Sequence, residues 1–138
     1  MDAVNPGQPP PSDFDEALNE LSHEVIGAAI AVHRELGPGY DESLYENALC
    51  VELKHRQIQH QRQVLVNVYY RDEQVGTGRM DLLIDNRLIV ELKVVETLAA
   101  IHTAQLVSYL KATRFQLGLL INFNVSRLRD GIKRVRYP

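Results

Sequence analysis

The sequence predicts an α/β fold in which helices pack against a small mixed β-sheet. Three observations lead to this prediction. Apolar residues recur at helical spacing between residues 14 and 56, the spacing changes to alternation after Ile58, and a further helical segment separates the last two predicted strands. The predicted order of elements is ααβββαβ, arranged as a sandwich of helices and sheet around one core. With 138 residues, the chain has the length of a single domain.

The first helix follows a tail of biased composition. Residues 1–12, MDAVNPGQPPPS, are rich in Pro and Gly, so we expect a disordered tail followed by a single domain at residues 13–138. Asp13 and Glu16 form a capping-box pattern that predicts the start of a helix. The Gly-Pro-Gly sequence at residues 37–39 predicts its end, because Gly suits the left-handed cap and Pro cannot continue the helix.

Two further helices are predicted from apolar spacing and end signals. One runs from about residue 42 to 56 and the other from about residue 98 to 112, where Thr97 is the expected N-terminal cap. The face predicted to be buried in the earlier of these two helices consists of Leu44, Ala48 and Val51, and His55 is a candidate for its last position.

Four strands are expected between and after these helices. In residues 64–69, valine alternates with Leu65, Asn67 and Tyr69, which predicts a strand, and residues 78–84 and 88–94 follow as a hairpin. Residues 115–123, FQLGLLINF, are nearly all apolar, which predicts a strand covered on both faces. The final segment, 127–138, is expected to form a short turn and an edge strand.

The apolar pattern selects one register for the central hairpin. A two-residue loop would place apolar side chains opposite charged ones along the whole ladder, whereas a three-residue loop, Asp85-Asn86-Arg87, aligns apolar with apolar. Asn can adopt the left-handed conformation that such a loop requires. The predicted pairs are Ile84 with Leu88, Leu82 with Val90, and Met80 with Leu92, which together would form one continuous apolar face.

This register brings charged residues together inside an apolar strand pair. Asp81 falls opposite Glu91, and Lys93 lies two residues further along the same face. Opposed residues have Cβ atoms about 4.5–5.5 Å apart, so the two carboxylates repel each other unless a divalent cation or Lys93 compensates their charge. A structural Asp–Lys–Glu network on a solvent-facing side of the sheet is the alternative. The apolar flanks favour a functional site.

The charges are unevenly spread along the chain, although the net charge is only −3. Residues 1–46 hold ten acids and one base, Arg34, whereas residues 107–138 hold seven bases and one acid, Asp130. Such a dipolar chain can present a basic face to phosphate groups despite its acidic total. Solvated surface charges explain the same composition, so the asymmetry permits a polyanionic partner without demonstrating one.

Several motifs together resemble a known family. Asp81 followed by Glu91-Leu92-Lys93 has the form of the D…ExK core of the PD-(D/E)XK nuclease superfamily. The pattern Gly39-x-x-Glu42-x-x-Tyr45 is similar to the signature of the GxxExxY protein family within that superfamily. Downstream, Gln105-x-x-x-Tyr109 and the segment LGLLINFN extend the resemblance, which covers about residues 21 to 135.

The resemblance implies a restriction-endonuclease-like αβββαβ core with an extra N-terminal helix and an active site on the central hairpin. It implies that Asp81 and Glu91 bind a metal ion, with the backbone carbonyl of Leu92 as a further ligand. Lys93 would orient the attacking water and stabilise developing charge. The remaining implied site residues are a helical acid, either Glu42, which matches the signature best, or Glu46, and Gln105 with Tyr109 on the following helix.

The function expected from these features is a metal-dependent nuclease that hydrolyses phosphodiester bonds of DNA with Mg²⁺ or Mn²⁺. A catalytically inactive module that binds nucleic acid or a partner protein is the first alternative, and hydrolysis of a smaller phosphate ester is the second. We expect no membrane span, a cytoplasmic location from the single Cys50, and a homodimer contact through strand 115–123 or the C-terminal tail.

Three residues invite a functional role that packing explains as well. His33 belongs to the segment VHRELGPG and either lines the site or is a buried, hydrogen-bonded histidine. Tyr45 and Tyr109 are expected to be core aromatics with satisfied hydroxyl groups.

Overall fold

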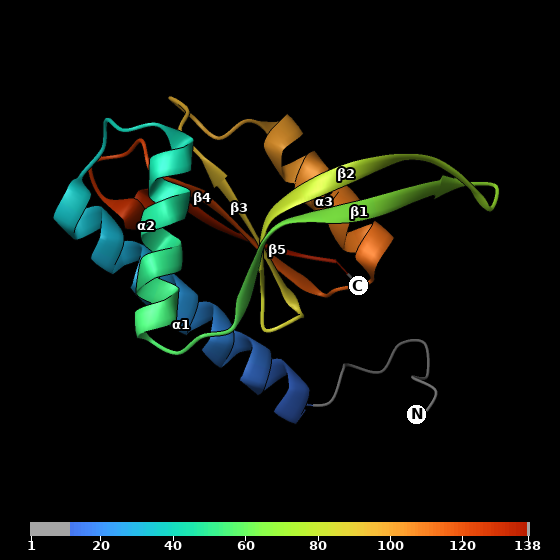
Figure 1. Ribbon diagram of the computed structural model, residues 1–138, viewed down its shortest axis with the longest axis horizontal. Helices are drawn as coiled ribbons and strands as arrows, with labels where there is room; N and C mark the ends of the chain where they lie inside the picture. The colour runs from blue at the N-terminus through green and yellow to red at the C-terminus, as the bar shows by residue number, and fades with distance from the viewer. Residues whose placement is uncertain (1–11, 138) are drawn as a thin grey trace.

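The computed structural model describes residues 12–137, which form three α-helices and a five-stranded mixed sheet (Figure 1). The sheet order is β1-β2-β3-β4-β5, in which β3 and β4 are parallel and the other neighbours are antiparallel. Of the expected tail at residues 1–12, residues 1–11 lie outside the described residues, and Ser12 already belongs to the first helix. The elements are α1 (Ser12–Leu36), α2 (Glu42–His55), β1 (His60–Tyr70), β2 (Glu73–Ile84), β3 (Leu88–Lys93), α3 (Ala100–Thr113), β4 (Leu117–Asn122), the 3₁₀ turn η1 (Leu128–Gly131) and β5 (Ile132–Arg136).

The helices divide into two layers on opposite faces of the sheet (Figure 1). Helices α1 and α2 cover one face, where Val25, Leu49 and Leu92 belong to the larger core. Helix α3 covers the other face, where Leu106 and Ile89 belong to a smaller core. The predicted α/β class and the predicted order of helices and strands are therefore confirmed, including the short turn and edge strand at the C-terminal end.

The central hairpin has the predicted register as far as its second pair. Leu88 pairs with Ile84 and Val90 with Leu82. Within the three-residue loop, Asp85 and Asn86 both have left-handed backbones, with φ of 49° and 58°. The loop length that the apolar pattern selected is thus confirmed.

Beyond Leu82 and Val90, strands β2 and β3 part. Strand β3 continues beside β4 through Lys93, whereas β2 continues beside β1 into a long hairpin arm that extends away from the sheet (Figure 1). The expected pair of Met80 with Leu92 is wrong, because Leu92 packs in the α1/α2 core and Met80 in the α3 core.

A kink in both strands explains why Met80 changes sides. The β1–β2 pairing runs from His60 through Arg62 with Leu82, omits Gln63 and Asp81, and resumes at Val64 with Met80. Gln63 has a left-handed backbone with φ of 51°, which a residue within a strand rarely adopts. The kink turns the outer part of the arm toward α3 and leaves Asp81 at the bend.

Helix α2 buries a different face from the predicted one. Val51 is 70% exposed, and the buried apolar residues are instead Tyr45, Leu49 and Leu53. The Tyr45 ring stacks on Phe123 with ring centroids 4.5 Å apart, and this contact fixes the rotation of the helix. The same rotation turns Glu46, on the Tyr45 side of the helix, into the protein.

Helix α3 begins two residues later than predicted, and Thr97 does not cap it. The N-cap is Ala99, whose backbone N–H donates to Nδ1 of His102 at 2.9 Å. His102 thus provides the half of a capping box in which the third helical residue accepts the N–H of the N-cap, whereas Ala99 has no side-chain oxygen to accept a helix N–H in return.

Strand β4 lies inside the sheet, between β3 and β5, and all six of its residues are buried. The prediction that this strand is covered on both faces is confirmed. The expectation that it contributes to a homodimer contact is wrong, because neither its faces nor its backbone edges are available to a second chain. β5 is an edge strand, so a homodimer contact through the C-terminal segment remains a prediction.

We predict that Gly131→Ala destabilises the fold by about 1–3 kcal/mol, the usual cost of forcing a methyl group into packed structure. A Cβ at this buried position would collide with the backbone carbonyl of Asn122 at the end of β4, so the turn itself would have to move. Gly76→Ala is the control, because a Cβ there meets nothing within 4 Å. Urea unfolding checks both variants, and equal stabilities would contradict the prediction.

Candidate active site

Asp81 and Glu91 face each other where β2 and β3 part, and they exchange hydrogen bonds across the gap. The backbone N–H of Asp81 donates to Oε2 of Glu91 at 2.7 Å, and the backbone N–H of Leu92 donates to Oδ2 of Asp81 at 2.8 Å. Two carboxylates therefore occupy the place where the next rung of the ladder would lie. Each carboxyl group uses one oxygen to accept a backbone N–H of the opposite strand.

Both carboxyl groups are poorly hydrated, and their pKa values reflect it. Glu91 is only 3% exposed, and burial, followed by repulsion from Asp81, raises the pKa of Glu91 to about 8. Burial also raises the pKa of Asp81, with the nearby Glu46 carboxylate contributing in the same direction. The pair is therefore difficult to ionise without an added positive charge.

Lys93 supplies one positive charge to this group of acids. Its ammonium lies close enough to Asp81, Glu91 and Glu42 to oppose the rise in pKa of all three carboxyl groups. Lys93 is partly buried at the end of β3, where its own carbonyl accepts the backbone N–H of Phe123 at 2.9 Å. The end of β4 thus fixes the backbone from which the ammonium extends.

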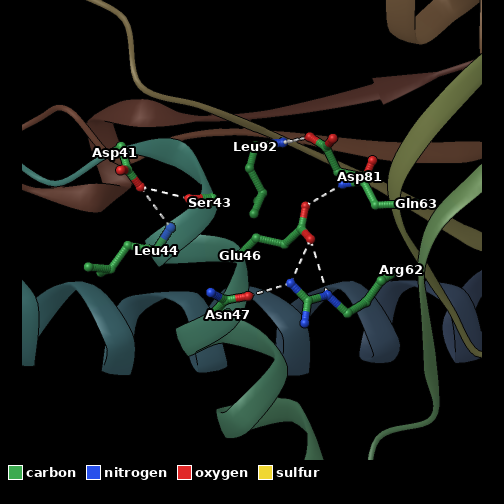
Figure 2. A network of polar contacts seen from close by, with 9 residues as sticks. All are labelled: Asp41, Ser43, Leu44, Glu46, Asn47, Arg62, Gln63, Asp81 and Leu92. Carbon is green, nitrogen blue, oxygen red and sulfur yellow. Dashed lines mark hydrogen bonds and ion pairs between the residues drawn. The ribbon is translucent and has the colours of Figure 1, made fainter.

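Helix α2 contributes both candidate acids, but in different ways. Glu42 opens the helix at the surface, and a partial loss of hydration, followed by the charge on Asp81, raises its pKa. Glu46, one turn later, is only 7% exposed and forms an ion pair with Arg62 at 2.8 Å (Figure 2). The partner of Glu46 is therefore a guanidinium, whereas Glu42 remains beside Lys93 and Asp81.

Gln63 is a site residue that the sequence did not reveal. Its side-chain amide donates to Oε1 of Glu46 at 2.6 Å (Figure 2). The same amide also interacts with Asp81 and lowers the pKa of that carboxyl. The left-handed backbone at Gln63 allows a strand residue to turn its amide toward α2 and Asp81. No Gly or Asn marks this kink, so the sequence carried no usable signal for it.

Gln105 and Tyr109 lie beside the arm rather than on the carboxylates. Gln105 is exposed and donates to the hydroxyl of Tyr109 at 3.4 Å, and that hydroxyl accepts the backbone N–H of Arg79 at 3.4 Å. The Tyr109 ring also packs over Gly78, where a Cβ would collide with it. Because Gly78 has no Cβ, the ring can approach the backbone of β2 closely. A role for Gln105 in the site remains a prediction.

The remaining motif residues are structural. Tyr45 is buried, and its hydroxyl donates to the carbonyl of Gly37, so its expected place as a satisfied core aromatic is confirmed. His33 is a buried, hydrogen-bonded histidine whose Nε2 lies 3.2 Å from the carbonyl oxygen of Phe123. Cys50 is buried, and burial raises the pKa of its thiol, which disfavours a nucleophilic thiolate.

The donor set fits a hard divalent cation that keeps part of its water shell. Across residues 12–137, no three His, Cys, Asp or Glu side chains come together as a preformed metal cluster. Asp81 and Glu91 provide two carboxylates on adjacent strands, and the Leu92 carbonyl lies in the same stretch of β3 as Glu91. Mg²⁺ is commonly held by one or two carboxylates and completes its shell with water and substrate phosphate.

The fold and this group of two acids and a lysine define a nuclease-like α/β domain. A family model described as the PD-(D/E)XK nuclease superfamily matches residues 19–135, so the chain belongs to that superfamily. Its members are generally nucleases, and they usually use divalent metal ions.

The other comparisons define the fold but add no function. A solved structure titled "Crystal structure of SSO0001" is 18% identical, with a TM-score of 0.55 over 70% of this chain. The aligned part is 50% of that chain, and at this identity the likeness shows the restriction-endonuclease-like fold alone. No curated protein matches the chain. Among residues 12–137, no helix is long and apolar enough to cross a membrane.

We predict that the metal-free protein loses stability as the pH rises from about 4.5 to about 8. In this window the unfolded Glu91 ionises while the folded one keeps its proton, so the folded state binds more protons and stability falls with pH. Glu91→Gln removes the titrating group and keeps an oxygen for the Asp81 N–H. Urea unfolding in EDTA should therefore show a flatter pH profile for this variant, and parallel profiles would contradict the assignment.

We predict that Gln63→Gly is more stable than Gln63→Ala by about 1 kcal/mol, because Gly adopts positive φ without the cost that a Cβ imposes. Both variants lose the same amide, so their difference reports the backbone alone. At Gln61, in the regular part of β1, the order should reverse, because Gly weakens an ordinary strand relative to Ala. Thermal unfolding of the four variants tests the assignment, and the same order at both positions would refute it.

Proposed function

We propose that this protein is a metal-dependent nuclease that hydrolyses phosphodiester bonds of DNA at the Asp81–Glu91–Lys93 site. The observation that carries the proposal is the pairing of the buried Glu91 carboxyl with the partly buried Asp81 carboxyl across parting strands, with an ammonium group acting on both. A purely structural ion pair would neutralise one acid with one base. Here one lysine faces three carboxyl groups, an excess of negative charge that suits a divalent cation.

In this proposal, Asp81, Glu91 and the backbone carbonyl of Leu92 would hold Mg²⁺ or Mn²⁺. A bound divalent ion lowers the pKa of its water and neutralises charge on the phosphate. Glu42, at the solvent-facing end of α2, is placed to accept a proton or a water hydrogen bond at the rim of the site. Lys93 supplies positive charge where the phosphorus centre gains negative charge.

The structure favours Glu42 over Glu46 as the helical acid. The Glu46 carboxylate already accepts hydrogen bonds from Arg62 and Gln63, which leaves it little capacity for another ligand. Its part in the proposal is to anchor Gln63, whose amide also contacts Asp81. Gln105 would reach the bound strand from α3, on the side where its amide and the Tyr109 hydroxyl flank the arm.

We predict that the purified protein cleaves DNA in Mg²⁺ or Mn²⁺ and not in EDTA. Glu91→Gln and Lys93→Met should each lower the cleavage rate by at least about 100-fold, the usual effect of removing one group that stabilises the transition state. Gel assays on labelled single- and double-stranded DNA and RNA measure the rate and identify the preferred substrate.

Two exposed residues provide matched controls. Glu24→Gln on α1 and Lys111→Met on α3 change the same groups away from the site, and both should cleave at the wild-type rate. Loss of activity in the site variants alone supports the nuclease. Salt-sensitive binding without cleavage would instead identify a binding module, and cleavage unaffected by Glu91→Gln would reject the proposed site.

A further inference from the structure

The basic C-terminal part of the chain does not form one continuous face. Lys133 and Arg134 are neighbours on β5, so their side chains point to opposite sides of the sheet. The Lys133 ammonium donates to Thr103 on α3 at 3.1 Å, and the Arg134 guanidinium donates to Asn19 on α1. The bases that sequence alone assigns to one polyanion surface are therefore distributed over both layers.

Two of the remaining bases meet the single base of the acidic N-terminal part. Arg127, which precedes η1, and Arg129, within η1, line a hollow of about 350 Å³ together with Arg34 from the last turn of α1. The fold thus brings the one base among residues 1–46 beside two from the far end of the chain. We call this feature the arginine hollow.

The lining of the arginine hollow suits an anion. Its lining residues include Arg34, Arg127, Arg129 and Ser126, and no Asp or Glu is among them. The ion pairs of the described residues involve Arg56, Arg62 and Arg87, so none of the three lining arginines is neutralised by a described carboxylate. Guanidinium groups bind phosphate through paired N–H donors, and a hydroxyl adds a further donor.

The arginine hollow is connected to β3 through hydrogen bonds to the backbone of Phe123. His33 forms part of its wall, and the imidazole Nε2 of His33 lies 3.2 Å from the carbonyl oxygen of Phe123. The N–H of the same Phe123 donates to the carbonyl of Lys93 at 2.9 Å. One residue thus separates the wall of the hollow from the strand that carries Glu91 and Lys93.

We propose that the arginine hollow binds a phosphate group, and specifically a backbone phosphate of the polynucleotide strand that also passes the carboxylates. The second part of this inference rests on the proposed nuclease function. A contact of this kind positions the strand without reading its sequence, because a phosphate presents the same oxygens at every nucleotide. It also explains how a chain with a net charge of −3 can hold a polyanion.

The first test measures strand binding without cleavage. Fluorescence anisotropy with labelled DNA in EDTA, over a series of NaCl concentrations, compares the wild type with two triple variants of equal net charge. The slope of log affinity against log salt should fall by about 1 for each phosphate that the variant no longer binds. The hollow variant is Arg34→Gln/Arg127→Gln/Arg129→Gln, and the control is Lys54→Gln/Lys111→Gln/Arg114→Gln, which changes exposed bases on α2, on α3 and just after α3.

A larger decrease of affinity and slope in the hollow variant supports the proposal. Equal decreases in both triples would show a general effect of charge and overturn it, as would unchanged binding in the hollow variant. All six substituted residues are exposed, so the variants should unfold at temperatures close to that of the wild type.

The second test separates a strand phosphate from a free one and is independent of nuclease activity. Inorganic phosphate is titrated against each protein, and two-dimensional NMR follows the amide signals of the segment around Arg127. Shifts in the wild type that are absent in the hollow variant support a phosphate site, even if the protein neither binds nor cleaves DNA. Shifts without any effect of the hollow variant on strand binding would assign the site to a free phosphate compound and refute the strand contact.

Discussion

The exchange of backbone hydrogen bonds between Asp81 and Glu91 is the interaction on which the site depends. Strands β2 and β3 cannot continue as a ladder, because β2 turns toward α3 with β1 while β3 stays in the sheet. The two carboxylates satisfy the N–H groups that this parting would leave unpaired. Hydrogen bonds to a charged acceptor are worth about 1.5–3 kcal/mol, less than the several kcal/mol that burial of a lone carboxylate costs, which is why Glu91 keeps its proton up to about pH 8 in the metal-free protein.

Packing in the rest of the fold offsets the free-energy cost of burying these acids. The apolar residues on both sides of β3 and β4 form two cores that hold the parting strands in place. Phe123, at the end of β4, contacts the Tyr45 ring, the imidazole of His33 and the Lys93 carbonyl. One core residue therefore fixes the rotation of α2 and the end of β3 together, so the acids of α2 and the lysine of β3 share a common support.

The polar residues around Asp81 form a second support. Arg62 and Gln63 both donate to Glu46, and Gln63 reaches Asp81 as well (Figure 2). This arrangement exists because β1 accepts a left-handed residue at the position beside Asp81. Backbone strain of this kind persists only where the surrounding contacts impose it, and it is concentrated at functional sites in many proteins.

The sequence by itself determined the element order, the hairpin register as far as Leu82 and Val90, and the proximity of Asp81, Glu91 and Lys93, because alternating polarity and a three-residue loop are local properties of the chain. It did not determine which face of α2 is buried, because the stacking of Tyr45 on Phe123 joins residues far apart in the chain. For the same reason, the kink at Gln63 and the proximity of Arg34 to Arg127 could be recognised only in the tertiary structure. Long-range packing decides which charged side chains lie close together, because the local sequence pattern does not indicate which distant residues become neighbours in the fold.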